Sequence, residues 1–420
     1  MSISVRAFAK SGAGIALSAV FGVGLVKLIS YHEGPEGVGA FGLFRQFFQF
    51  LAIFFTLGSG YSIVEGYPKA RDRVAFIRIA ASYALAVSLS LSALVLLFSE
   101  EICVALYSDL ENLNLIRSIP LFLVPLSVHQ LIKSALSAQG YIGLSGIATA
   151  LPFFTMFVIA LFSRELFDLY FYSGLLSFLL GLVLYRSPVR NLLPGFPLKR
   201  LESFERTTIS AVVGGASGFL SFLAVKAVCT HRLGIWNTGL LEGAWSLVGY
   251  TTLIYLTSLS VYYLPKVSAE PEQKKFRDHY FTLINGLALA SLGFICVFSS
   301  FFIHLLFTPE FGAMTKILVW MAIGEYLKCL NWVFIFSMIG LSYKKAYLAL
   351  DLLANALFMV LLYLSTVSDL RDLGRIYIAF QVCYLLGNIA LNFKHGMLRT
   401  SSVLANVGVG VFLWAILLGL

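Results

Sequence analysis

The sequence is poor in charged residues. Lys, Arg, Asp and Glu make up 12% of its 420 residues, about half of the roughly 25% that is usual in soluble domains. Apolar residues make up 59% of the chain and aromatic residues 15%. A soluble fold has too little interior to bury so much apolar surface, and a disordered chain would contain far less of it. The composition therefore predicts a polytopic membrane protein.

Catalytic motifs are also missing. The chain contains no G-x-S-x-G, no H-E-x-x-H and no Walker loop, and no polar segment is large enough to bind a nucleotide. The five cysteines form no C-x-x-C pair, so neither zinc nor a disulfide framework is indicated. Residues 37–42 match G-x-G-x-x-G but follow no strand, so we interpret these glycines as helix-packing residues. We expect no enzymatic activity, no cofactor and no metal.

Long basic runs are absent as well. The net charge is +9, yet no block of five like charges could follow a nucleic-acid backbone. The basic residues lie in short connections between apolar segments, where anionic lipid headgroups explain them better. We therefore expect membrane lipids and no nucleic acid as partners.

Twelve apolar segments are long enough, at about 20 residues, to cross a hydrocarbon core of ~30 Å as helices. The segment near the N-terminus resembles a signal peptide but is too long for one, so we interpret it as the first span. A further segment at 403–420 either crosses the membrane or lies at its surface. The predicted spans are 10–30, 39–63, 75–98, 118–138, 142–163, 167–185, 208–228, 238–262, 280–304, 315–340, 346–367 and 374–393.

Basic residues concentrate in alternate connections. Lys69, Arg190 and Lys274 belong to connections that share one side of the predicted membrane, whereas Glu100 and Glu111 belong to a connection on the other side. Positively charged connections remain in the cytoplasm. This pattern predicts a cytoplasmic N-terminus and cytoplasmic ends for the twelve-helix core.

Short motifs recur on both sides of the longest connection. Residues 142–145 (Ile-Gly-Leu-Ser) recur at 339–342, and Pro68-Lys69 recurs at Pro265-Lys266, in both cases 197 positions later. Six spans per half give both halves the same orientation, which predicts a parallel repeat with a central cavity between two six-helix lobes. The predicted parts are an N-terminal lobe at 1–186, a cytoplasmic linker at 187–207, a C-terminal lobe at 208–395 and an extra hydrophobic segment at 396–420.

Ionisable residues within the predicted spans are candidates for function, because each costs roughly 2.5–3.5 kcal/mol in the hydrocarbon core. Arg45 has Gln49 one turn further along and no acidic residue within one turn in the sequence. An anionic ligand or a water-filled cavity would explain Arg45. Glu242 occupies the position 197 residues after Arg45.

Three further spans place polar pairs on one helix face. Glu325 and Lys328 are spaced i,i+3, whereas Asp351 with Asn355 and His129 with Lys133 are spaced i,i+4. Each pair can serve a ligand or can simply join helices. Lys133 can also extend to the cytoplasmic interface.

Four motifs together resemble a known family. They are Gly34-Pro35-Glu36-Gly37, Phe44-Arg45-Gln46, Ser260–Pro265 and Gly324-Glu325-Tyr326-Leu327-Lys328. In this order and spacing the chain, from residue 1 to about 395, resembles Wzx-type flippases. These are the O-antigen and lipid III translocases of the multidrug/oligosaccharidyl-lipid/polysaccharide (MOP) exporter superfamily. Glu325 stands where lipid III flippases have Asp, and residues 396–420 depart from the twelve-helix pattern.

The resemblance implies a function and a set of site residues. It implies that undecaprenyl-diphosphate-linked oligosaccharide, an O-antigen or common-antigen repeat unit, crosses a bacterial inner membrane to its periplasmic leaflet by alternating access. A polysaccharide polymerase and a chain-length regulator are its candidate protein partners. The candidate substrate-binding residues are Arg45, Gln49, His129, Lys133 and Lys328, and the candidate coupling acids are Glu242, Glu325 and Asp351.

Two alternatives remain open at this point. A cation-coupled antiporter for drugs or small solutes belongs to the same superfamily, but an acid pair would dominate its cavity. A membrane O-antigen polymerase or ligase would need sizeable periplasmic loops for its chemistry. The longest external connection, at 99–117, is short for that purpose.

Overall fold

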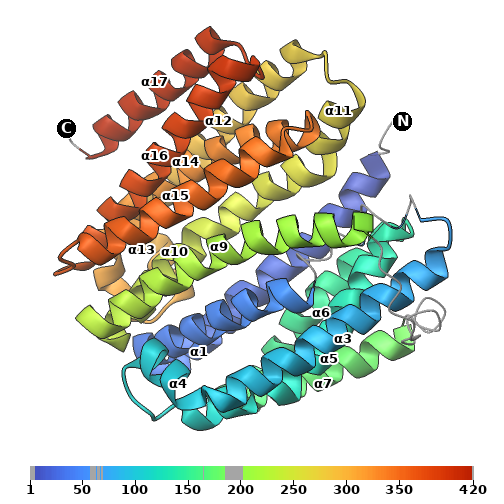
Figure 1. The fold of residues 1–420 in the computed structure, drawn as a ribbon. Coiled ribbons are helices and arrows are strands. Elements are labelled where there is room, and N and C mark those ends of the chain that lie inside the picture. The colour runs from blue at the N-terminus through green and yellow to red at the C-terminus, as the bar shows by residue number, and fades with distance from the viewer. Residues whose placement is uncertain are drawn as a thin grey trace. The chain divides into compact units, whose positions relative to one another are not determined.

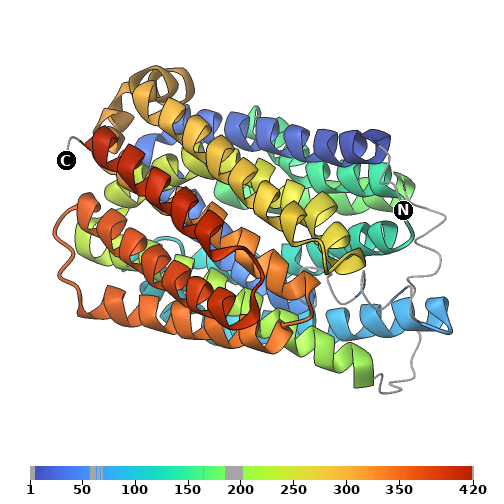
Figure 2. The same ribbon diagram turned by 90° about the horizontal axis from the view of Figure 1, so that it is seen from above.

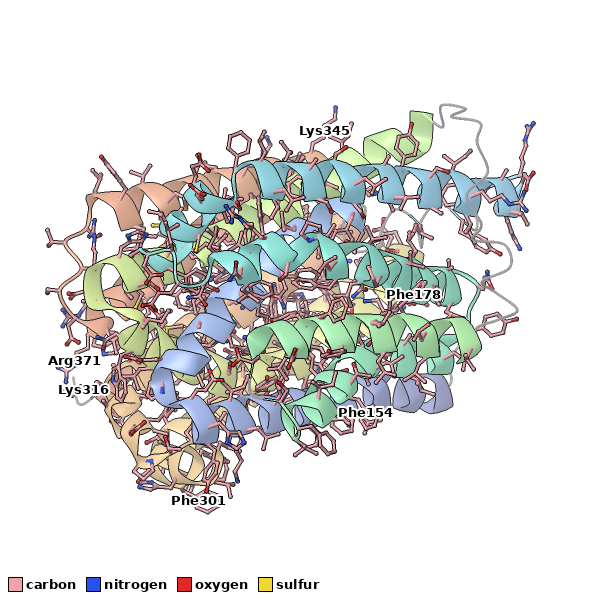
Figure 3. The ribbon with its side chains drawn as sticks, turned by 90° about the horizontal axis from the view of Figure 1, so that it is seen from below. Phe154, Phe178, Phe301, Lys316, Lys345 and Arg371 are labelled. Carbon is pink, nitrogen blue, oxygen red and sulfur yellow. The ribbon has the colours of Figure 1, made fainter. Side chains whose placement is uncertain are left out.

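The computed structural model describes residues 5–56, 63, 67, 70–163, 165–184 and 202–418, and these are almost entirely α-helical (Figure 1). Among them there is no β-strand, and nine helices are long and apolar enough to cross a membrane. Apolar side chains such as Phe154 and Phe301, which are 41% and 62% exposed, point outward (Figure 3). The prediction of an all-α polytopic membrane protein is confirmed.

The chain divides into two compact units, Ser2–His231 and Arg232–Leu420. The boundary lies in the last turn of α9, and most of the predicted linker at 187–207 lies outside the described residues. The predicted lobes at 1–186 and 208–395 stay predictions. The helices up to this boundary are α1 (Val5–Phe55), α3 (Arg73–Leu97), α4 (Ser99–Tyr107), α5 (Leu113–Ala138), α6 (Ile142–Ala160), α7 (Leu166–Leu184) and α9 (Glu202–Leu233).

The second unit contains the remaining helices. They are α10 (Ile235–Ser258), the π-helical turn η2 (Leu259–Tyr263), α11 (Leu264–Ala269), α12 (Lys274–Val297), α13 (Ser299–Leu306), the 3-10 turn η3 (Pro309–Met314), α14 (Thr315–Gly340), α15 (Lys344–Leu364), α16 (Leu370–His395) and α17 (Thr400–Leu418). Every predicted span overlaps a helix, and residues 57–62 of the span 39–63 lie outside the described residues. Helix α1 covers two of these spans, while α7 and α10 are not among the nine apolar helices.

Helix α1 is bent at Gly34, where φ is 62° and ψ is −157°. Glycine tolerates this left-handed region because it has no Cβ, and the proline that follows suits the first turn of a helix. The two arms pack on different partners: Phe21 lies 5.1 Å from Phe154 of α6, whereas Phe44 lies 4.5 Å from Tyr170 of α7, measured between ring centroids. The bend thus separates the first two predicted spans.

The same local structure returns about 200 residues later. Gly234, between α9 and α10, has φ 87° and ψ 161°, so it combines a positive φ with an extended ψ as Gly34 does. Phe98 ends α3 and precedes the short helix α4, just as Phe298 ends α12 and precedes α13, with nearly equal backbone angles. A repeat is therefore visible in the local structure of the two units.

The repeat has a different register from the predicted one. The turn between α5 and α6 has Gly140 at φ 83°, and the turn between α14 and α15 has Ser342 at φ 66°. In each turn the next residue, Tyr141 or Tyr343, donates its backbone N–H to a carbonyl five residues back, at 2.9 and 2.7 Å. Residues 142–145 therefore begin a helix, whereas residues 339–342 end one. The predicted 197-residue register is wrong at this motif.

Helices α5 and α7 pack side by side in the first unit, as α14 and α16 do in the second. Helices α14 and α16 run parallel, because Gly374 near the start of α16 lies against Trp320 of α14. Lys316 and Arg371 accordingly lie at the same end of this unit (Figure 3). Helix α17 packs against α12 and α16 (Figures 1 and 2), and its apolar part, Thr400–Ala415, is shorter than the nine candidate spans.

Candidate functional site

Glu325 lies near the middle of α14 and its side chain is fully buried. Three side chains from neighbouring helices donate hydrogen bonds to its carboxylate. Trp245 Nε1 of α10 lies 3.0 Å from Oε1, Tyr377 Oη of α16 lies 2.7 Å from Oε1, and Thr252 Oγ1 of α10 lies 2.9 Å from Oε2. Donors this close stabilise the ionised form of a buried carboxylate.

Lys328 completes this cluster, which we call the Glu325 site (Trp245, Thr252, Glu325, Lys328 and Tyr377). Lys328 Nζ lies 3.0 Å from Oε1 and 3.2 Å from Oε2 of Glu325, and 5.0 Å from the centre of the Trp332 ring. The Lys328 side chain is 20% exposed, whereas that of Glu325 is not exposed at all. Glu325 and Lys328 thus share one helix face, as their spacing predicts, and form an ion pair there. The cation is the more accessible member of the pair.

A glycine allows Tyr377 to reach the carboxylate. A Cβ built on Gly324 would lie 2.3 Å from the Tyr377 ring, so α16 can approach α14 this closely only at a residue without a side chain. Such close approach is the common reason for small residues between membrane helices. Gly324 therefore positions the hydroxyl group that holds Glu325.

Amide side chains continue the contact between α14 and α16. Asn331 Nδ2 donates to Gln381 Oε1 at 3.0 Å, and Asn388 Nδ2 donates to Asn331 Oδ1 at 2.9 Å. All three residues are buried. Buried hydrogen bonds between membrane helices fix how the helices align. These amides therefore hold α14 and α16 in register on the C-terminal side of the Glu325 site.

The other two predicted acids have different surroundings. Asp351 Oδ1 accepts a hydrogen bond from Tyr384 Oη of α16 at 2.9 Å, which joins α15 to α16. Glu242, on α10, is 1% exposed and accepts a hydrogen bond from Ser246 Oγ at 3.2 Å. At an offset of 200 residues the position equivalent to Arg45 is Trp245, so Glu242 is not its repeat partner. The coupling roles of Glu242 and Asp351 stay predictions.

Arg45 is half-buried on the second arm of α1, with Cζ 5.5 Å from the centre of the Phe41 ring. A second cation contacts the same arm of α1. Lys226 of α9 is 3% exposed, and its Nζ donates to the carbonyl oxygen of Gly42 at 3.2 Å and to Gln46 Oε1 at 3.3 Å. Lys226 thus binds residues on both sides of Arg45 in the sequence. Gln49, one turn further, is half-buried.

His129 and Lys133 lie on α5. His129 is fully buried, with Nε2 2.8 Å from the carbonyl oxygen of Ala148 of α6, and Gly181 of α7 also packs against its ring. Lys133 is half-buried. The environment of His129 is that of a residue that joins three helices. The assignment of both residues to substrate binding stays a prediction.

The predicted site residues fall in both units. Arg45, Gln49, His129 and Lys133 belong to Ser2–His231, whereas Glu242, Glu325, Lys328 and Asp351 belong to Arg232–Leu420. Within the second unit, hydrogen bonds join Glu325 to Lys328, while Asp351 is bonded to Tyr384 instead. The described residues contain no group of three or more His, Cys, Asp or Glu side chains that could hold a metal ion.

Sequence reasoning missed the three donors of the Glu325 site. Trp245, Thr252 and Tyr377 lie 50 to 80 positions from Glu325 in the sequence, so no local spacing reveals them. Sequence reasoning also did not identify Lys226. A basic residue inside a predicted span is itself a signal for a buried contact, and that signal could have identified Lys226.

Solved structures share this fold. The inward closed conformation of the lipid II flippase MurJ superposes with a TM-score of 0.73 at 12% identity, with 97% of each chain covered. An outward-facing multidrug resistance MATE family transporter of the MOP superfamily gives 0.67 at 14% identity, over 93% of this chain and 94% of that one. A MOP superfamily transporter from Pyrococcus furiosus gives 0.68 at 14% identity, over 98% and 95%.

Sequence comparisons add no relative. No protein-family profile matches the chain, and no curated protein matches it. The structural likeness extends over nearly the whole chain at identities far too low to carry function. The chain has the fold of the MOP superfamily transporters.

Proposed function

We propose that this chain is a flippase that moves undecaprenyl-diphosphate-linked oligosaccharide from the cytoplasmic to the periplasmic leaflet of a bacterial inner membrane. The observation that carries the proposal is the ion pair between the buried Glu325 and the partly exposed Lys328, in a fold shared with a lipid II flippase. The resemblance of residues 324–328 to the corresponding motif of Wzx-type flippases supports the same substrate class.

The chemistry of this substrate explains why such a protein needs cations at membrane depth. The undecaprenyl tail is soluble in hydrocarbon, whereas the diphosphate and the sugars are not. A lysine offers a compact charge to a phosphate, and an arginine offers a planar fork. Lys328 is partly exposed and Arg45 is half-buried, so both are suitable first contacts for a diphosphate.

Substrate binding at Lys328 would change the state of Glu325. A diphosphate competes with the carboxylate for the ammonium group, since both are oxygen anions. Glu325 would then retain its neutral donors Trp245, Thr252 and Tyr377 but lose the cation that balances its charge. A buried carboxylate in that condition takes up a proton or changes its partner. This exchange would couple substrate binding to alternating access. In the proposed topology the N-terminus lies in the cytoplasm.

The test compares single and double neutral variants. Lys328→Ala should lose substrate binding, whereas Glu325→Gln should bind substrate and fail to turn over. Lys316→Ala is the matched control, because Lys316 is an exposed lysine of the same helix. Membrane abundance and translocation of lipid-linked oligosaccharide are measured for each variant. Full transport by Glu325→Gln at normal abundance would eliminate the coupling role.

A double variant separates coupling from structural support. Removing one partner of a buried ion pair destabilises a protein strongly, whereas replacing both with neutral residues is often harmless. If the pair only supports the fold, Glu325→Gln with Lys328→Met should restore both abundance and transport. If the pair couples binding to movement, the same double variant should be abundant and inactive. Exchanging the two charges is less informative, because an ammonium at position 325 would face the indole N–H of Trp245.

A second candidate is a cation-coupled antiporter for drugs or small solutes. The likeness to MATE transporters, at a TM-score of 0.67, favours it. In that case the buried Glu325 would exchange an ion for a cationic solute, and cells lacking the chain would become sensitive to drugs while keeping their surface polysaccharide. A polysaccharide defect without altered drug sensitivity would favour the flippase over the antiporter. For a flippase, the proposed protein partners are a polysaccharide polymerase and a chain-length regulator.

A further inference from the structure

The N-terminal end of helix α17 is bonded to helix α12 of the same unit. Arg277 of α12 is 4% exposed, and its Nε donates to the carbonyl oxygen of Met397 at 2.7 Å. The neighbouring Asp278 accepts the backbone N–H of Arg399 at 2.7 Å and pairs with the Arg399 guanidinium at 3.3 Å. Two consecutive residues of α12 therefore hold the connection that leads into α17.

A polar chain links the middle of α17 to α14. Asn406 of α17 and Asn285 of α12 share a hydrogen bond of 3.0 Å between Nδ2 of Asn285 and Oδ1 of Asn406. Asn285 Oδ1 in turn accepts the hydroxyl of Tyr326, at 2.6 Å. Asn406 Nδ2 also donates to Thr282 Oγ1 at 3.1 Å. Tyr326, the last residue in this series of hydrogen bonds, directly follows Glu325 in α14.

A glycine of α17 receives the Tyr326 ring. A Cβ built on Gly410 would lie 1.8 Å from Oη and 2.5 Å from Cζ of Tyr326, so only glycine fits there. Trp414, one turn further along the same face of α17, lies 6.2 Å from Tyr326 between ring centroids. By contrast, a Cβ on Gly408 would have no atom within 4 Å. The contact thus depends on one position of α17.

Glu325 and Tyr326 face different neighbours. Successive residues of an α-helix point about 100° apart, since 3.6 residues make one turn. The Glu325 carboxylate is held by α10 and α16, whereas the Tyr326 hydroxyl is held by α12 and its ring by α17. A rotation of α14 that released Tyr326 would also move Glu325 away from its donors.

We infer that α17 is a positioning element for α14, and that Gly410 and Asn406 hold Tyr326 so that Glu325 stays in its site. The functional part of this inference rests on the proposed function, while its structural part can be measured separately. Residues 396–420 are also the part of the chain that departs from the twelve-helix pattern of the Wzx-type flippases.

The experiment introduces Gly410→Ala, with Gly408→Ala as the matched control. Cys329 of α14 is fully buried one turn after Glu325, so its alkylation by N-ethylmaleimide reports displacement of this helix. Alkylation is followed by mass spectrometry in the full-length protein in detergent. Gly410→Ala should speed alkylation of Cys329 by about tenfold, the size of a strong coupling between contacting residues, while Gly408→Ala leaves it unchanged. Cys329 as protected in Gly410→Ala as in the wild type would overturn the inference.

Two controls separate displacement of α14 from general unfolding. Cys103 and Cys229, which are buried in the first unit, should keep their wild-type rates in Gly410→Ala. Adding Tyr326→Leu removes the ring atoms that the new Cβ would meet, so the double variant should protect Cys329 as well as Tyr326→Leu alone does. Faster alkylation at all three cysteines without this rescue would mean that Gly410 only supports folding, which also overturns the inference.

Transport assays then distinguish this inference from the proposed function. Translocation of lipid-linked oligosaccharide should fall in Gly410→Ala and remain normal in Gly408→Ala. If Cys329 becomes reactive while translocation stays normal, α17 does position α14 and the role proposed for Glu325 is wrong. If translocation falls while Cys329 stays protected, the positioning role of α17 is wrong and the proposed function is unaffected.

Discussion

Tyr377→Phe removes one oxygen atom from the Glu325 site and leaves the aromatic ring in place. The ring still packs against Gly324 and against Trp245, whose ring centroid lies 5.3 Å away. The lost contact is a hydrogen bond of 2.7 Å to a fully buried carboxylate. The substitution therefore isolates the contribution of this hydroxyl to holding Glu325.

The expected loss follows from the charge of the acceptor. A hydrogen bond to a charged group contributes about 1.5–3 kcal/mol to stability. Trp245 Nε1 and Lys328 Nζ continue to donate to the same oxygen, so we expect the lower end, about 1.5 kcal/mol in the free energy of unfolding. In the Glu325→Gln background the acceptor is neutral, and the same substitution should cost only about 0.5–1 kcal/mol.

Unfolding of the detergent-solubilised protein by a denaturing detergent measures these free energies for all four members of the cycle. Tyr384→Phe is the matched control, because that tyrosine lies on the same helix and donates to Asp351 at 2.9 Å. Its cost should be the same with and without Glu325→Gln. Equal losses for Tyr377→Phe in both backgrounds would refute the argument that its hydroxyl stabilises the charged form of Glu325.

Two further predictions concern the first unit and the topology. Arg45→Ala should abolish surface polysaccharide at normal protein abundance, and Arg45→Lys should restore it only in part, because lysine lacks the planar fork; wild-type polysaccharide in Arg45→Ala would rule out a phosphate contact. A cysteine introduced at position 190, which lies outside the described residues, should be protected from an impermeant thiol reagent in intact cells, while one at position 111 should react. Labelling of position 190 from outside would contradict a cytoplasmic N-terminus.

The helical framework could be predicted because apolar length is a local property of the sequence. Each predicted span overlaps a helix, and the i,i+3 spacing of Glu325 and Lys328 is sufficient to predict that they share one helix face. The bend in α1 was less accessible. Gly34 and Pro35 are ordinary turn residues in the sequence, and only the structure shows that they join two helical arms at a positive φ.

Other features depend on contacts between distant parts of the chain. Tyr377 reaches Glu325 because Gly324 lets two helices approach, and neither residue signals this by its spacing. The sequence indicates the repeat only through short motifs. A four-residue match can occur at positions that are not structurally equivalent, as residues 142–145 and 339–342 show. The turns at Gly140 and Ser342, which lie 202 positions apart, share no such motif.

Translocation by the purified protein in liposomes tests the central claim most directly. Undecaprenyl-diphosphate oligosaccharide is placed in one leaflet, and its appearance in the other is followed with a glycosidase that cannot cross the membrane. We expect translocation by the wild type and by Lys316→Ala, and none by Lys328→Ala or by Glu325→Gln. Translocation at the wild-type rate by Lys328→Ala, or none by the wild type, would contradict the proposed function.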